Sequence, residues 1–220
     1  MVPPMDEQPA DSRTTYLLAA HPNWRESRAN RRLLKAARGV PAVRVQDLHA
    51  AYPDYDIDVA AEQRAMEAAQ LVVLLHPIQW YSMPALMKLW VDEVLTHGWA
   101  YGRGGTALVG KDLWLVATTG GPEASYHPTG YNRYFFDAFL PPYEQTAALC
   151  GMRFLPPLLF HGAHRAKKEE LDAHAVLFAD RLRSYPDWPE LEELQACVPT
   201  VVPSSDRPAE ADAATSEDAR

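Results

Sequence analysis

The sequence predicts one α/β domain in which a parallel β-sheet is covered by helices on both faces. Two observations support this class. The runs Leu71–Leu75 and Leu113–Ala117 are apolar at every position, as strands buried on both sides should be. Such runs alternate with segments in which apolar residues recur every three or four positions, which is typical of amphipathic helices.

Five strands and three helical faces can be placed along the chain. The predicted strands are Thr15–His21, Ala42–Leu48, Leu71–Pro77, Asp112–Gly120 and Met152–His161. The helical faces are formed by Ala29, Leu33 and Ala37, then by Leu86, Leu89, Trp90, Val94 and Leu95 before Gly98, and last by Leu171, Ala175, Phe178 and Leu182. Right-handed crossovers then predict a flavodoxin-like three-layer αβα sandwich, with a five-stranded parallel sheet in the order 2-1-3-4-5.

Composition sets the limits of the domain and its partners. We expect a folded domain at 14–198, between a flexible N-terminal segment at 1–13 and a disordered acidic tail at 199–220, because both ends lack aromatic residues. A net charge of −8 argues against a nucleic-acid partner. The chain shows neither a signal peptide nor a membrane-length apolar run, so a cytoplasmic protein is expected. The small number of cysteines, Cys150 and Cys197, favours a reducing compartment, and a single disulfide is the alternative.

Unusual residues gather in the loops that follow strands one, three and four. In an open parallel sheet, ligands bind beyond the carboxyl ends of the strands, at the point where the strand order reverses. The three loops span residues 21–30, 76–84 and 118–131. We therefore predict that they meet to form one binding site.

Each loop suggests a role and an alternative. Ser27 is a good N-cap, and Ser27–Asn30 would present free N–H groups to a phosphate; the alternative is an ordinary capped helix. Ile78–Tyr81 would sandwich a flat ring, or form a dimer interface, or do both. Thr118–Gly121 would let the backbone approach a ligand closely, where the alternative is a plain tight turn.

Other site classes are not favoured. No G-x-G-x-x-G follows the first strand, so Asp47 is not a convincing dinucleotide-ribose ligand, and no P-loop is present. The His-Pro pairs at His21, His76 and His127 lie on one sheet edge, but no carboxylate accompanies them at ligand spacing. No metal site is predicted.

Several stretches resemble the NAD(P)H:quinone oxidoreductase family, and especially the KefF and KefG ancillary proteins of glutathione-regulated potassium efflux systems. The resemblance covers nearly all of Thr14–Leu182. The matching stretches are His21-Pro with Ser27–Asn30, Tyr52–Asp58 with Glu62-Gln63, His76–Ser82, Pro84–Asp92, His97–Gly102, Gly104–Leu108, Thr118–Gly121 and Leu155–Pro157.

The resemblance implies a non-covalently bound flavin, FMN with FAD as the alternative, in a homodimer. The residues implied to bind the phosphate are His21, Ser27, Arg28, Ala29 and Asn30, and those implied to contact the ring are Ile78, Gln79, Trp80, Tyr81, Thr118, Thr119, Gly120 and Gly121. The implied reaction is a two-electron, ping-pong hydride transfer from NAD(P)H to a quinone.

The resemblance also suggests the catalytic residues. Relatives use a Tyr and a His after the Thr-Thr-Gly-Gly loop. Tyr126 falls at the Tyr spacing, but Asn132 stands where the His would be. We therefore take Tyr126 and His127 as the catalytic candidates.

Two other functions remain open. In the first, the protein would act as a Kef-type regulatory subunit that docks on a potassium efflux transporter at the inner face of the plasma membrane. A one-electron carrier of flavodoxin type is less favoured, because Ser27–Asn30 lacks the Ser/Thr-rich phosphate loop with a glycine.

Overall fold

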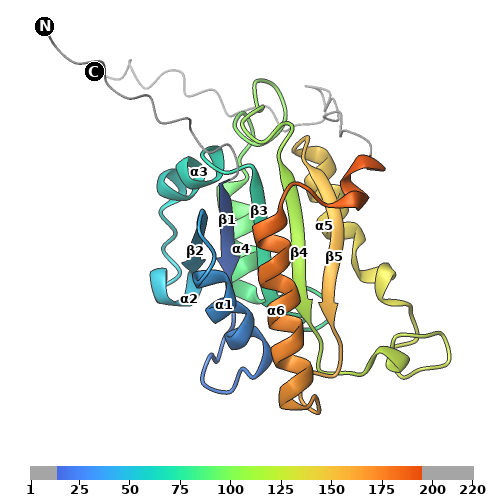
Figure 1. Cartoon of the computed structure of the whole chain (residues 1–220). Coiled ribbons are helices and arrows are strands. Elements are labelled where there is room, and N and C mark those ends of the chain that lie inside the picture. The colour runs from blue at the N-terminus through green and yellow to red at the C-terminus, as the bar shows by residue number, and fades with distance from the viewer. Residues whose placement is uncertain (1–13, 195–220) are drawn as a thin grey trace, which may run out of the picture.

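The computed structural model describes residues 14–194 and alternates strands with helices along the chain (Figure 1). The elements are β1 (Thr15–Ala19), α1 (Ala29–Arg38), β2 (Val43–Asp47), α2 (Leu48–Ala51), α3 (Val59–Glu67), β3 (Leu71–Pro77), α4 (Ala85–Val94), β4 (Asp112–Thr118), α5 (Pro141–Leu149), β5 (Arg153–Phe160) and α6 (Lys168–Ser184), with 3₁₀ turns η1 (Glu123–Ser125), η2 (Phe136–Phe139) and η3 (Pro189–Glu192).

The five strands form one parallel sheet in the order β2-β1-β3-β4-β5, which confirms the predicted fold and strand order. The predicted strand limits differ mainly at the carboxyl ends. β1 stops at Ala19 rather than His21, and β4 at Thr118 rather than Gly120. The residues beyond these ends leave the ladder and belong to the loops at that edge.

Helices cover both faces of the sheet, with α1 and α6 on the near face in Figure 1 and α4 behind it. Successive strand residues point to opposite faces. Leu17 and Ala19 therefore pack with α1 and α6, whereas Tyr16 and Leu18 pack with α3 and α4. Trp114 anchors the near layer, with its ring centroid 5.5 Å from that of Phe178. The four residues predicted for the last helical face are all buried in α6.

One carboxylate on the far face collects four hydrogen bonds. Glu62 in α3 is 1% exposed and accepts from the hydroxyls of Tyr16 (2.7 Å) and Tyr52 (2.5 Å), the indole N–H of Trp90 (2.8 Å) and the amide of Gln46 (2.9 Å). Burial raises the pKa of both tyrosines above the ordinary value. We call these five residues the Glu62 cage; it ties α3 to β1, β2 and α4.

β5 is an outer strand of the sheet and contains two prolines. Pro156 and Pro157 have no backbone N–H to offer. The pairing of β4 with β5 shifts register between Trp114 and Val116, and the Trp114 indole donates to the Pro156 carbonyl at 3.0 Å. The strand is thus bound on its inner side only.

Several sequence predictions fall outside the described part of the chain. The segments predicted to be flexible (1–13) or disordered (199–220), Cys197 and the last residues of the predicted domain lie there. Cys150 is buried, and burial raises the pKa of its thiol to about 11. Among the described helices, none combines the length and hydropathy that crossing a bilayer requires.

Candidate functional site

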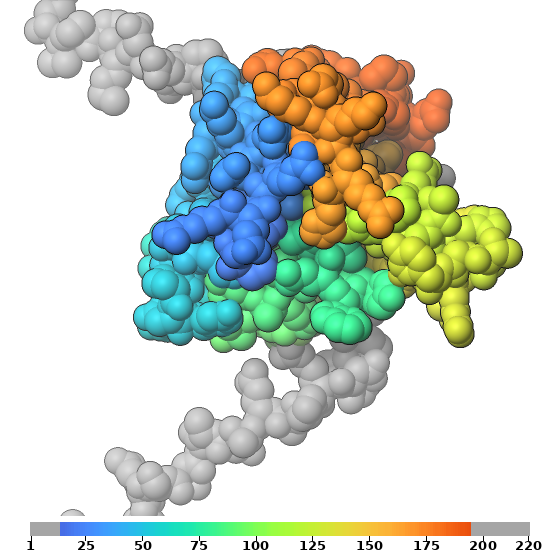
Figure 2. All heavy atoms as spheres, turned by 90° about the horizontal axis from the view of Figure 1, so that it is seen from below, coloured from blue at the N-terminus to red at the C-terminus, as the bar shows by residue number. Residues whose placement is uncertain are grey.

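A pocket of about 270 Å³ opens at the carboxyl edge of the sheet. Figure 2 looks onto this edge, where the loops after β1 (blue), β3 (green) and β5 (orange) surround a recess. We call it the carboxyl-edge pocket. Its lining residues are His21, Glu26, Ser27, Arg28, Ala29, Asn30, Pro77, Ile78, Gln79, Thr118, Thr119, Gly120, Ala163 and His164. Ten of the thirteen predicted cofactor-binding residues are among them; Trp80, Tyr81 and Gly121 lie in the same loops but do not line it.

The amino terminus of α1 faces this pocket. The helix begins at Ala29, one residue later than a Ser27 cap would give, and Ser27 Oγ accepts from the Arg31 N–H at 3.2 Å. The first N–H groups of a helix have no partner within the helix. The first turn of α1 carries no acidic residue but contains Arg31 and Arg32, an arrangement that the helix dipole disfavours. A bound anion such as phosphate would offset this repulsion.

Asn30 provides a direct test of whether the pocket fits a phosphate. Its side chain is buried, and Nδ2 donates to Thr118 Oγ1 at 2.8 Å. Its Oδ1 is buried without a hydrogen-bond partner among residues 14–194. Rotating the amide by half a turn would direct the NH₂ group into the pocket, while the oxygen accepts from the Thr118 hydroxyl. Asn30 therefore fits an anionic ligand in this rotated orientation, in which its unpartnered end is a donor rather than an acceptor.

The loop after β3 holds its aromatic residues in a strained conformation. Trp80 and Tyr81 have φ angles of 46° and 66°, a range that is unfavourable for residues other than glycine. Reciprocal backbone hydrogen bonds between Gln79 and Ser82 close the turn. Trp80 is 93% exposed, and the Tyr81 ring stacks on Phe139 with centroids 5.1 Å apart. The turn presents two large rings beside the pocket.

The turn after β4 lies against the loop that follows β5. A Cβ at Gly120 would lie 2.9 Å from the His164 ring, so a side chain there would displace that ring. The Thr119 N–H donates to the Phe160 carbonyl, and the Thr119 carbonyl accepts from Ala163. These bonds join the turn to the loop that follows β5.

The loop after β5 is the part of the site that sequence reasoning missed. Ala163 and His164 line the pocket, and the Arg28 guanidinium donates to the carbonyls of His164 and Ala166, both at 2.8 Å. Arg28 thus clamps the start of α1 to this loop instead of pointing freely into the pocket. The strand-end rule, applied to the fifth strand, would have found the loop.

Tyr126 and His161 lie together beside the turn after β4. Their ring centroids are 5.3 Å apart, and His161 Nδ1 lies 3.0 Å from Thr119 Oγ1. Burial raises the pKa of Tyr126 and lowers that of His161, so both are neutral at pH 7. His161 directly follows β5, and no sequence pattern distinguished it.

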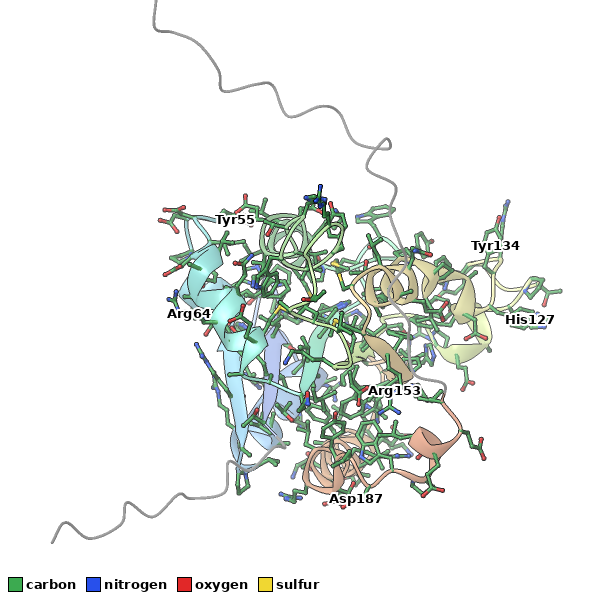
Figure 3. All side chains as sticks on the ribbon, turned by 90° about the horizontal axis from the view of Figure 1, so that it is seen from above. Tyr55, Arg64, His127, Tyr134, Arg153 and Asp187 are labelled. Atoms are coloured by element: carbon green, nitrogen blue, oxygen red, sulfur yellow. The ribbon has the colours of Figure 1, made fainter. Side chains whose placement is uncertain are left out.

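The structure places His127 elsewhere. Its Nδ1 lies 2.9 Å from Thr129 Oγ1, and its ring packs edge-on to Phe135. Figure 3 shows His127 and Tyr134 at the outer end of residues 123–139, which we call the outer lobe. His127 does not line the carboxyl-edge pocket, and its catalytic role stays a prediction.

The three His-Pro histidines occupy different environments. His21 lines the pocket, whereas His76 is fully buried, with its Nε2 3.4 Å from the Tyr143 hydroxyl. Burial lowers the pKa of His76 to about 4. Within residues 14–194, no three His, Cys, Asp or Glu side chains are grouped in a way that would hold a metal ion. Asp47 accepts from the Trp24 indole at 3.0 Å.

Comparisons with known proteins agree with this architecture. The profile of the flavodoxin-like fold family matches residues 13–182. The potassium-efflux ancillary protein KefF of Citrobacter koseri is 45% identical over 77% of this chain and 95% of its own length. General stress protein 14 of Treponema denticola, solved in complex with FMN, is 37% identical with a TM-score of 0.74, covering 78% of this chain and 98% of its own.

A second solved structure, described as an NADPH-quinone reductase from P. pentosaceus, is 26% identical with a TM-score of 0.70 and covers 77% of this chain and 97% of its own. The resemblance predicted from sequence is thereby confirmed. The chain belongs to the flavodoxin-like fold family, within the group that contains quinone reductases and the Kef ancillary proteins.

Proposed function

We propose that this protein is an FMN-dependent NAD(P)H:quinone oxidoreductase. The observation that carries the proposal is the buried Asn30 amide in the first turn of α1, one end of which has no partner and can become a donor by rotation, at the carboxyl edge where this fold class binds ligands. A solved structure that is 37% identical over 78% of this chain contains FMN, which favours FMN over FAD.

Different residues of the pocket would bind the phosphate and the ring of the cofactor. Ser27, Arg28, Ala29 and Asn30 would hold the phosphate at the start of α1, with His21 beside them. The loops Ile78–Tyr81 and Thr118–Gly121 would contact the ring. When bound, FMN supplies the redox chemistry, in which NAD(P)H, a proton and a quinone become NAD(P)⁺ and a hydroquinone, with the two substrates using the site in turn.

The chain's own residues would orient the substrates and handle the proton. The Tyr126 hydroxyl and the His161 imidazole are neutral at pH 7, and both lie beside Thr119. A neutral phenol can donate a hydrogen bond to negative charge that develops in the pocket, and the backbone N–H groups of Gly120 and Gly121 would do the same. Exposed Trp80 would shield the reacting ring from water.

We also propose that the protein is a homodimer. Trp80, Tyr131, Tyr134 and Phe135 are all more than half exposed, on the outer lobe and the neighbouring turn. Contiguous exposed aromatic surface is typical of an interface between proteins. Sedimentation should give twice the monomer mass of 24.6 kDa. The double variant Tyr131→Ser, Phe135→Ser should sediment as a monomer.

Flavin binding by wild type and Asn30→Asp tests the proposal. The carboxylate keeps an acceptor for the Thr118 hydroxyl but repels a phosphate, so FMN affinity should fall by at least about tenfold, or about 1.4 kcal/mol. Affinity for riboflavin, which lacks the phosphate, should not change. If the wild-type protein neither binds FMN nor oxidises NAD(P)H in the presence of a quinone, the proposed oxidoreductase activity is refuted.

The identity to KefF favours a second candidate, a regulatory subunit of a potassium efflux transporter. The protein would then lie at the inner face of the plasma membrane through its partner. Potassium efflux should be measured in cells that contain a Kef-type transporter together with either the wild-type form of this protein or its Asn30→Asp variant. Activation that survives the loss of FMN binding would mean that docking, and not reduction, is the regulatory act.

A further inference from the structure

A fully buried histidine lies directly behind the wall of the carboxyl-edge pocket. His76 is the second-last residue of β3, and the residues that follow it, Pro77, Ile78 and Gln79, line the pocket. His76 is not itself a lining residue, so it acts on the pocket through these neighbours. Burial of a polar ring costs free energy unless its nitrogens are hydrogen-bonded, and the partners of this ring therefore indicate what it does.

His76 holds the first peptide group of the pocket loop. Its Nδ1 lies 3.0 Å from the carbonyl oxygen of Pro77. A carbonyl can only accept, so the proton of the neutral ring resides on Nδ1 and is donated to this oxygen. On the other side of the same peptide group, the Ile78 N–H donates to the Thr118 carbonyl at 2.8 Å. The plane of the peptide between Pro77 and Ile78 is therefore fixed at both ends.

Tyr143 of α5 supports the imidazole from the side of the core. Its hydroxyl lies 3.4 Å from His76 Nε2, and the two rings are stacked, with centroids 5.8 Å apart and an angle of 17° between their planes. With the proton on Nδ1, Nε2 is an acceptor, so the phenol donates to it. Tyr143 is itself buried, and it therefore holds the ring of His76 in one orientation.

The loop needs such a support because packing offsets only part of its strain. Trp80 and Tyr81 keep positive φ angles, and a conformation of this kind persists only where the surrounding structure fixes it. Trp80 is almost fully exposed, so its ring contributes little packing to the turn. The reciprocal bonds between Gln79 and Ser82 close the turn but do not tie it to the sheet. At the β3 end, the peptide that His76 holds makes that connection.

We propose that His76 is a positioning residue for ring binding: by orienting the Pro77 carbonyl, its imidazole sets the conformation of the loop that receives the flavin ring. This inference rests on the proposed function, because the ring is that of the flavin. The phosphate end of the pocket is formed by the start of α1 and not by this loop. Loss of the imidazole should therefore weaken the binding of FMN and of riboflavin by the same factor, whereas Asn30→Asp should weaken FMN alone.

The variants test the two nitrogens of the imidazole separately. In His76→Asn, the amide nitrogen can take the place of Nδ1 and still donate to the Pro77 carbonyl. In His76→Gln the amide reaches the place of Nε2 instead, and His76→Leu offers no polar atom. Flavin titration should give dissociation constants about three- to tenfold higher for His76→Gln and His76→Leu, with FMN and riboflavin alike. His76→Asn should stay close to wild type, and Tyr143→Phe, which keeps the stacked ring, should show a smaller increase than His76→Leu.

A second measurement needs no cofactor. In the flavin-free protein, hydrogen exchange followed by mass spectrometry reports the opening of the Ile78, Gln79 and Ser82 amides, whose N–H groups are bonded in this loop. Their exchange should be about three- to tenfold faster in His76→Leu than in wild type or His76→Asn. The amides of β1 should keep the wild-type rate, which would show that the fold is intact and the opening local.

His174→Leu is the matched control. His174 also has a buried ring nitrogen, but it lies in α6 against Phe160, with ring centroids 4.8 Å apart, and does not line the carboxyl-edge pocket. This variant should alter neither the exchange of the pocket loop nor the affinity for either flavin.

The outcomes separate the two proposals. Loop exchange and flavin affinity that stay at the wild-type level in His76→Leu would overturn the positioning role and leave the oxidoreductase intact. Losses of the same size in His76→Asn and His76→Leu, or a loss confined to FMN, would do the same. A wild-type protein that binds neither flavin would overturn the proposed function, and with it the role of His76 in ring binding.

Discussion

The Glu62 cage and the carboxyl-edge pocket both place polar groups in the interior, but they satisfy them differently. In the cage, one buried carboxylate receives four hydrogen bonds. In the pocket, Asn30 keeps an unpartnered oxygen, and in the adjoining loop Trp80 holds a disfavoured φ. The difference indicates that the cage contributes stability, whereas the pocket gives up stability in order to receive a ligand.

Removing the carboxylate is expected to have the largest effect. Glu62→Ala would leave the donors of Tyr16, Tyr52 and Trp90 buried without an acceptor and should lower the free energy of unfolding by about 3–5 kcal/mol. Urea unfolding measures this loss. Glu67→Ala, at the exposed end of the same helix, is the control and should cost less than about 1 kcal/mol. Equal losses in the two variants would remove the distinction between cage and surface.

The next effect concerns His76, which lies in β3 directly before the pocket loop. Its pKa in the folded protein, about 4, lies below the ordinary value of 6.5, so the unfolded chain takes up the proton more readily. Stability is therefore complete above about pH 6.5 and should fall by about 2–3 kcal/mol as the pH drops to about 4.5. Unfolding at both pH values checks this. The His76→Gln variant should lose distinctly less stability over the same pH range. An equal loss would contradict the assignment of this pH dependence to His76.

The smallest effect tests the strain in the pocket loop. Trp80→Gly removes a side chain that disfavours a φ of 46° and should raise the free energy of unfolding by up to about 1 kcal/mol. Trp80→Ala keeps the conformational cost and should show no gain. Both variants should bind FMN several-fold more weakly, because the exposed ring is gone. A Trp80→Gly protein less stable than Trp80→Ala would show that the loop is unstrained.

The sequence predicts the sheet well because strands buried on both faces are apolar at every position. Leu71–Pro77 is predicted to the residue, and the chain order of the strands then leads to the correct sheet order. α3 and α5 were not assigned individually. α5 starts with two prolines, and the core-facing positions of α3 include the charged Glu62, so neither shows a plain apolar stripe.

The site was predictable only where the residue types were unusual for their position. Ser27–Asn30 and Thr118–Gly121 stand out after buried strands, and the structure brings Ser27–Asn30 and Thr118–Gly120 together in one pocket. The positive φ of Trp80 carries no sequence signal, because such angles are expected of glycine. The Arg28 clamp and the contact of His161 with Thr119 join residues far apart in the chain, and only the folded backbone brings them into register.

The two prolines of β5 have a consequence for how the molecule meets its neighbours. An outer strand with unused N–H groups is a template on which another chain can add a strand and start an aggregate. Pro156 and Pro157 interrupt the row of N–H donors in the middle of β5. Growth of the sheet from one molecule into the next is discouraged at this edge, so association through the β5 side is expected to use side-chain packing and not a shared strand.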